Sequence, residues 1–186
     1  MKNVQPLPAH PSLFCNKFAA VIIYLISRIN DQLPKFLLLP FVRITPHLFV
    51  GPQINRRGWL SLRQRHNITS VVNLRVESDD RERGIEPEHY LWLPTIDHTS
   101  PTVEQLHRAA EFISERIDAG EGVYIHCAAG VGRAPLTAAA YLILQGYGVD
   151  EALDLLRTRR PFISQSPNQR ARLIQFAEFI KEKQQS

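Results

Sequence analysis

From residue 44 onward, apolar runs of two kinds alternate along the chain. Short runs rich in β-branched or aromatic residues, typical of strands, lie at 48–50, 69–74, 90–93 and 123–126. Longer stretches with apolar residues at helical spacing lie at 59–66, 100–120, 134–146 and 150–160, and a last one begins at 166. Strands interleaved with helices predict an α/β fold, in which helices flank a central, mostly parallel sheet.

Local signals refine these elements. Ser100 followed by Pro101 predicts a helix start, and the Ser166–Gln169 spacing is that of a capping box. The first helix has three apolar residues that we expect to face inward: Trp59, Leu60 and Leu62. The polar stretch 77–88 carries both charges and predicts a solvated surface loop.

The first 43 residues have a different composition and predict an N-terminal extension before a catalytic domain at 44–186. Residues 1–12 contain three prolines and read as a loose tail. The apolar run 18–26, bounded by Lys17 and Arg28, is too short to span a bilayer. The apolar pattern of residues 13–43 therefore predicts either peripheral contact with a membrane or a helical lid packed on the domain.

Charge and cysteine usage narrow the function classes. The chain has 186 residues, a formal net charge of +4 and a pI near 9.3, which favours anionic partners. Nucleic acid is not expected, because the arginines form no stripe interleaved with aromatic residues. The cysteines, Cys15 and Cys127, lack metal-ligand spacing, so we expect no metal site. A Cys15–Cys127 disulfide stays open, but a reduced, cytoplasmic protein, either free or peripheral to a membrane, is the simpler interpretation.

The strand at 123–126 runs straight into the segment with the candidate chemistry. This segment is His126-Cys127-Ala128-Ala129-Gly130-Val131-Gly132-Arg133. Its small residues let the loop curl with N–H groups inward, and its two glycines can adopt backbone angles closed to other residues. Converging N–H groups at a helix start stabilise a thiolate and bind a phosphate dianion, and an arginine fork grips two phosphate oxygens. We therefore predict Cys127 as nucleophile, residues 128–132 as phosphate cradle and Arg133 as clamp.

This segment resembles the signature loop of protein tyrosine and dual-specificity phosphatases, and the resemblance covers roughly residues 44–180. It implies a phosphocysteine intermediate, no metal or other cofactor, and a general acid on a loop upstream of the cysteine. Asp97 holds that place, thirty residues before Cys127, between a strand and a helix. One carboxyl group there can serve both proton transfers.

Three other residues are alternatives for the acid. Asp79 and Asp80 lie in the charged loop that predicts solvated surface. His98 is a further alternative, because histidine is the side chain commonly used for proton transfer near neutral pH.

One position departs from the family pattern. The family usually has Ser or Thr after the arginine, and its hydroxyl donates to the cysteine sulfur; here Ala134 and Pro135 follow Arg133. A similar Gly-Arg-Ala-Pro sequence occurs in the phosphatases of regenerating liver, whose turnover is weak. We therefore expect slow hydrolysis of the phosphocysteine.

Three functions stay open. The first is a dual-specificity phosphatase acting on phosphorylated proteins at tyrosine, serine or threonine. The second is a phospholipid phosphatase, because segment 93–99 and the apolar extension are similar to the mitochondrial phosphatidylglycerophosphate phosphatase. Lysines that would favour highly charged inositol lipids are absent from the loop. The third is a low-turnover binding module, which Ala134 favours.

Two further groups have a structural and a functional interpretation. Arg157, Arg159 and Arg160 end a helix before a proline, where cations cap the carboxyl end, or they attract an acidic substrate. Asn168 and Gln169 are similar to family residues that hold the loop or the attacking water, although capping explains Gln169 equally well.

Overall fold

The computed structural model describes residues 41–161 and 163–185. Its five-stranded sheet has the order β1-β2-β5-β3-β4. The strands are β1 (Val42–Arg43), β2 (Leu48–Pro52), β3 (Ile68–Arg75), β4 (His89–Thr95) and β5 (Gly122–Cys127). Only β1 is antiparallel to its neighbour among the described strands, whereas β2, β5, β3 and β4 pair in parallel. The mostly parallel sheet expected from the sequence is confirmed.

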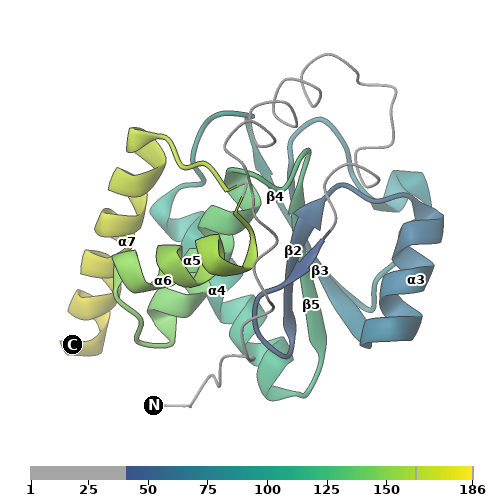
Figure 1. The fold of residues 1–186 in the computed structure, drawn as a ribbon, viewed down its shortest axis with the longest axis horizontal. Helices are drawn as coiled ribbons and strands as arrows, with labels where there is room; N and C mark the ends of the chain where they lie inside the picture. The colour runs from purple at the N-terminus through teal and green to yellow at the C-terminus, as the bar shows by residue number, and fades with distance from the viewer. Residues whose placement is uncertain (1–40, 162, 186) are drawn as a thin grey trace.

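Helices cover both faces of the sheet (Figure 1). On one face lies α3 (Arg56–His66), and the other face carries the remaining α-helices. These are α4 (Val103–Asp118), α5 (Arg133–Leu144), α6 (Val149–Arg159) and α7 (Pro167–Gln185). A short 3₁₀ turn, η1 (Arg81–Arg83), interrupts the loop between β3 and β4.

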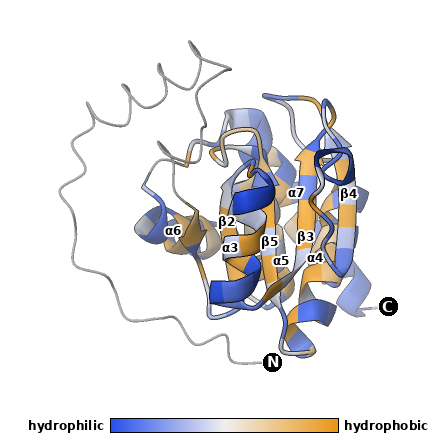
Figure 2. Cartoon of the chain, turned by 90° about the vertical axis from the view of Figure 1, so that its right-hand side faces the viewer, coloured by the Kyte–Doolittle hydropathy of each residue, from blue (hydrophilic) through white to orange (hydrophobic). Residues whose placement is uncertain are grey.

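The larger core lies between the sheet and the four helices α4–α7, and α5 is its centre. Residues 133–143 of α5 are all buried, with alanine at positions 134, 138, 139 and 140. Small side chains let neighbouring helices and strands approach α5 closely, so its first turn is fixed from all sides. Figure 2 shows the apolar strands between the helical layers. The helix that follows the candidate phosphate loop is thus the best-buried helix in the described part of the chain.

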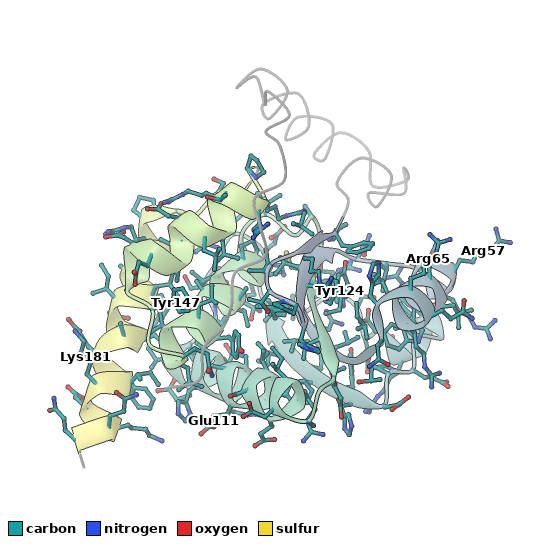
Figure 3. The ribbon with its side chains drawn as sticks, turned by 60° about the horizontal axis from the view of Figure 1, so that its bottom comes forward. Arg57, Arg65, Glu111, Tyr124, Tyr147 and Lys181 are labelled. Carbon is teal, nitrogen blue, oxygen red and sulfur yellow. The ribbon has the colours of Figure 1, made fainter. Side chains whose placement is uncertain are left out.

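The smaller core lies under α3 and partly confirms the predicted inner face. Trp59 and Leu62 are 3% exposed, but Leu60 is 41% exposed, so its predicted burial is wrong. Leu60 follows Trp59 directly, and successive helix residues point about a quarter turn apart. Tyr124 of β5 belongs to the same core and appears inside the molecule in Figure 3.

Two predicted helix starts have different outcomes. The capping box at Ser166 and Gln169 is confirmed, because each backbone N–H donates to the other side chain's oxygen, at 3.1 and 3.2 Å. At α4 the predicted start at Ser100 is wrong. Thr102 is the N-cap and forms a reciprocal capping box with Gln105, so the helix begins at Val103.

Most of the predicted N-terminal extension, including residues 13–40 and Cys15, lies outside the described residues. The sheet already begins at β1, whose Arg43 pairs with Phe49 of β2. Among the helices that the structure describes, none is both long and apolar enough to cross a membrane.

Candidate active site

The carboxyl ends of four parallel strands meet at one edge of the sheet, and Cys127 ends the central one. Cys127 pairs with Pro52, the last residue of β2, and Thr95 pairs with Arg75 at the ends of β4 and β3. In parallel α/β sheets, ligands bind beyond this edge. The fold therefore places the predicted nucleophile where a ligand is expected, with a side chain that is 3% exposed.

The loop after Cys127 is held by bonds to its outward-facing carbonyls. Ala128 O accepts from Gln53 N at 3.1 Å, and Val131 O accepts from Ser164 N at 3.0 Å. Because the C=O and N–H groups of a peptide unit point in opposite directions, these bonds leave N–H groups for the interior of the loop. One of them, Gly130 N, donates to Cys127 Sγ at 3.3 Å.

The two loop glycines have different reasons to be glycine. Gly130 has φ of +68°, and a Cβ there would lie 2.3 Å from the carbonyl carbon of Gly51, so both conformation and space require glycine. Gly132 has φ of −112°, so the special backbone angle predicted for it is wrong. A Cβ at Gly132 would instead come within 3.3 Å of Gln169 Nε2.

Arg133 is buried with 1% exposure and is fixed by the two neighbouring strand ends. Its Nη1 donates to Thr95 O at 2.6 Å and to Leu74 O at 3.2 Å. Its Nη2 lies 2.9 Å from Asp97 Oδ1 as an ion pair outside hydrogen-bond geometry. Neither Nη2 nor Nε hydrogen-bonds within the described residues. A buried guanidinium with two such N–H groups is suited to an oxyanion.

Asp97 lies in an exposed turn that directly follows β4. The turn closes through Thr99, whose N and Oγ1 both donate to Ile96 O, at 3.2 and 2.6 Å. Asp97 Oδ1 accepts from the backbone N of His98 at 3.0 Å, and His98 has a φ of +61°. The side chain of Asp97 is 57% exposed, yet it forms an ion pair with buried Arg133. The structure thus brings the predicted acid to the predicted clamp.

Helix α7 contributes to this turn. Gln169 Nε2 donates to Thr99 O at 3.0 Å while its Oε1 accepts from Ser166 N. Gln169 therefore caps α7 and also ties α7 to the acid turn, whereas a role in holding the phosphate loop or the attacking water stays a prediction. Asn168 lies in the first turn of α7 and is exposed.

The alternative aspartates do not both lie on the surface as predicted. Asp80 is fully buried, and its Oδ2 lies 2.6 Å from Nε2 of His126, which is also fully buried. The prediction of solvated surface is wrong for Asp80 because His126, 46 residues away, supplies a partner below the loop. Asp79 accepts from Tyr90 Oη at 2.8 Å. His126 lies immediately before the nucleophile and stacks on Tyr124, with ring centroids 5.7 Å apart.

Arg160 is a residue whose role the sequence interpretation missed. It is 1% exposed, and its Nε donates to Gly130 O at 2.8 Å while Nη2 donates to Ala129 O at 3.3 Å. Burial lowers the pKa of its guanidinium, and nearby Tyr124 and Cys127 oppose this effect. Arg160 thus supports the phosphate loop from outside. Its place before Pro161 was visible in the sequence, but nothing there distinguished it from its exposed neighbour Arg157.

Another carboxylate lies near the clamp. Glu77 Oε2 is 3.9 Å from Arg133 Nη1, and Glu77 Oε1 accepts from Arg75 Nε at 3.0 Å. Burial raises the pKa of Glu77, but hydrogen bonds from its own backbone and from Arg75, with the charges of Arg75 and Arg133, bring it below the ordinary value. Arg75 also bonds Gln53 through Nη1. Gln53, Arg75 and Glu77 thus form a connected row of polar side chains that ends at Arg133.

The position after Arg133 offers no hydroxyl to the nucleophile. Ala134 is fully buried and has no hydroxyl to offer the thiol. The nearest hydroxyl along α5, that of Thr137, donates to Arg133 O at 3.0 Å. Over the residues that the structure describes, no group of three His, Cys, Asp or Glu side chains could hold a metal ion.

Comparisons with known proteins agree on one family. The family model described as "Dual specificity phosphatase, catalytic domain" matches residues 48–179. The chain is 30% identical over 137 residues to dual specificity protein phosphatase 5 of Homo sapiens, covering 73% of this chain and 35% of that protein. It is 31% identical over 140 residues to phosphatidylglycerophosphatase and protein-tyrosine phosphatase 1 of Rattus norvegicus, covering 74% and 69%.

Solved structures give the same result. The crystal structure of PTPMT1 in complex with PI(5)P matches with a TM-score of 0.72 and 26% identity, covering 77% of this chain and 97% of that one. The active form of Tk-PTP matches with a TM-score of 0.65 and 29% identity, covering 75% and 97%. The chain spans about a third of the length of dual specificity protein phosphatase 5, at 35%.

Proposed function

The chain belongs to the dual-specificity phosphatase family, and we propose that it hydrolyses phosphomonoesters through a phosphocysteine on Cys127. One observation carries the proposal. The thiol and the Arg133 guanidinium lie at the two ends of a loop whose carbonyls are bonded outward, with Gly130 N donating to Sγ at 3.3 Å. Such a loop stabilises a thiolate and receives a phosphate dianion with little rearrangement.

Binding would use the loop and the clamp together. The N–H groups of residues 128–132 would donate to the phosphate oxygens, and Arg133 would donate through Nε and Nη2. These two atoms make no hydrogen bond within the described chain, while Nη1 is engaged by Thr95 and Leu74. Two contacts from a rigid fork fix the orientation of the phosphoryl group for in-line attack.

Two displacement steps follow from this arrangement. In the first, the Cys127 thiolate forms an S–P bond while the P–O bond of the ester breaks, and Asp97 gives its proton to the leaving oxygen. In the second, water attacks the phosphocysteine, the S–P bond breaks to return the thiolate, and Asp97 takes a proton from the water. The exposed turn that carries Asp97 is open to the leaving alcohol and to the incoming water.

The second step is expected to be the slower one. A departing thiolate is stabilised by donors, and here Gly130 N is the donor that the described structure provides to Sγ. Ala134 supplies no further donor. We therefore propose that phosphocysteine accumulates during turnover. If its hydrolysis were extremely slow, the protein would act mainly as a binding module with little turnover.

The substrate that we propose first is a phosphorylated protein side chain. Dual specificity protein phosphatase 5, to which this chain is similar, supports this choice. A phospholipid monophosphate is the second candidate, supported by the printed name of the rat phosphatidylglycerophosphatase relative and by the PTPMT1 complex with PI(5)P. We also propose that the segment before Phe41 is an extension to the catalytic domain and contacts a membrane, whereas Val42 and Arg43, counted with the extension in the sequence prediction, belong to the sheet.

Hydrolysis of para-nitrophenyl phosphate in reducing buffer with a chelator tests the proposal. Cys127→Ser should lose activity by at least about a thousandfold because the nucleophile is gone, while still binding a phosphate analogue. Arg133→Ala should weaken both binding and turnover, whereas Arg157→Ala is a matched surface control. An acid-quenched wild-type reaction should contain phosphate on Cys127. Activity that survives Cys127→Ser would refute the mechanism.

A further inference from the structure

Exposed apolar side chains follow the outer strand β4 toward the acid turn. Along this strand Leu93 and Thr95 are buried, while the side chains between and beyond them face solvent. We define the apolar stripe as Val76, Trp92, Pro94 and Ile96. Three of these are 47%, 40% and 66% exposed, for Val76, Trp92 and Ile96 respectively. Single exposed apolar residues are ordinary, but several along one strand next to a site mark an interaction surface.

The apolar stripe is fixed to the sheet and continuous with the candidate site. Trp92 Nε1 donates to Arg75 O at 2.7 Å, which holds the indole beside the end of β3. Val76 and Ile96 directly follow the residues that form the last β3–β4 pair. Ile96 in turn precedes Asp97, which pairs with Arg133. A molecule resting on the stripe would therefore present its phosphate to the clamp.

The same face of the sheet carries a basic helix. Tyr90, two residues before Trp92 on β4, packs on the core beneath α3, so Trp92 leaves the sheet on the α3 side. Helix α3 has four arginines and no carboxylate: Arg56, Arg57, Arg63 and Arg65. Arg57 and Arg65 project outward from α3 in Figure 3. Arg63 pairs with Glu88, whereas Glu77 and Asp97, which directly follow the stripe residues Val76 and Ile96, pair with arginines of the site.

We propose that the apolar stripe and the arginines of α3 seat the protein on an anionic phospholipid surface. An exposed indole and aliphatic side chains insert at the boundary of headgroups and acyl chains, and arginines bind anionic headgroups. A peptide adding to the edge of β4 is disfavoured, since Pro94 removes a backbone donor from that strand. The inference deepens the lipid candidate and rests on the proposed phosphatase only for turnover, because the seating itself is a binding event.

The two tryptophans of the chain allow a direct test. Trp59 is buried at 3% exposure and Trp92 is exposed at 40%. Vesicles of phosphatidylcholine and phosphatidylglycerol containing brominated lipid should quench Trp92 in the Trp59→Phe variant and leave Trp59 unquenched in the Trp92→Phe variant. This readout separates the stripe from any binding by residues 1–40, which sedimentation alone would not do. Absence of Trp92 quenching would overturn the proposal.

Activity measurements then separate this inference from the proposed function. Val76→Ser should lower activity on a vesicle-borne lipid phosphomonoester by roughly threefold to tenfold, the effect of losing about one apolar anchor, and leave para-nitrophenyl phosphate hydrolysis unchanged. Ile174→Ser is the matched control, because Ile174 is 39% exposed on α7, across the sheet. Equal losses in both variants would overturn the proposal, as would protection of Trp92 from acrylamide by a phosphopeptide but not by vesicles. Quenching of Trp92 in a chain without phosphatase activity would sustain the inference and refute the proposed function.

Discussion

The phosphate loop and the acid turn meet at Arg133, but they are held in opposite ways. In the loop, Cys127 is 3% exposed and Arg133 is 1% exposed, and backbone and buried side chains fix the carbonyls. In the turn, the side chains of Asp97 and His98 are 57% and 70% exposed. The loop must keep one shape for an anion, whereas the turn must admit a leaving group and a water molecule. Rigidity and access are thus divided between two segments.

The largest effect should come from removing the carboxylate of the exposed turn. Asp97→Asn should lower turnover of phenyl phosphate by about a hundredfold to ten-thousandfold, the usual contribution of a positioned acid. The loss should be at least tenfold smaller with 2,4-dinitrophenyl phosphate, because its phenoxide departs without a proton. Steady-state kinetics with both esters measures the difference. Asp79→Asn is the control, and equal losses on the two esters would remove Asp97 from the proton-transfer role.

The buried side of the comparison is tested at Asp80. Asp80→Ala leaves His126 buried without its partner 2.6 Å away, so unfolding should become easier by about 3–5 kcal/mol. Urea denaturation measures this change. Asp154→Ala, which breaks an exposed pair with Arg157, should cost no more than about 1 kcal/mol. Similar values for the two variants would show that burial adds nothing to the Asp80 pair.

Arg160 tests whether the loop depends on support from outside. Arg160→Met removes the donors to Gly130 O and Ala129 O. Because hydrogen bonds from a charged group are lost, the free energy of unfolding should fall by about 2–3 kcal/mol. If the loop loses its shape, turnover should fall equally for esters with good and with poor leaving groups. Asp97→Asn, by contrast, should mainly affect esters with poor leaving groups. Arg157→Met, on the same helix and half exposed, is the matched control. A loss confined to poor leaving groups would place Arg160 with the acid turn instead.

The smallest effect is expected on the hydrolysis of the phosphocysteine, the step in which the phosphate loop and the acid turn both act. Ala134→Ser restores a hydroxyl at the first turn of α5 and should speed phosphocysteine hydrolysis by about threefold to tenfold, the value of one hydrogen bond. Rapid-quench measurement should show a smaller burst and a faster steady state. A change in the first step alone, with the same steady-state rate, would contradict the role assigned to this position.

Features with local causes could be predicted from the sequence. Strand and helix periods gave the α/β class, and the glycine and arginine spacing after the strand at 123–126 identified the loop. Asp97 was predicted as the acid because it lies between a strand end and a helix start, the place that the family resemblance implies. The wrong helix start also has a local cause. Thr102, two residues after Ser100, forms reciprocal hydrogen bonds with Gln105 and is therefore the N-cap.

The sequence by itself determined which residues carry the candidate chemistry, because a thiol, a phosphate cradle and an arginine within one short segment need no distant partner to be recognised. Only the tertiary structure decided which charged residues became buried supports. Asp80 meets His126 across 46 residues, and Arg160 meets Gly130 across 30. The environment of a charge depends on the surfaces that the fold packs against it, so two arginines alike in sequence, Arg157 and Arg160, end in solvent and under the phosphate loop.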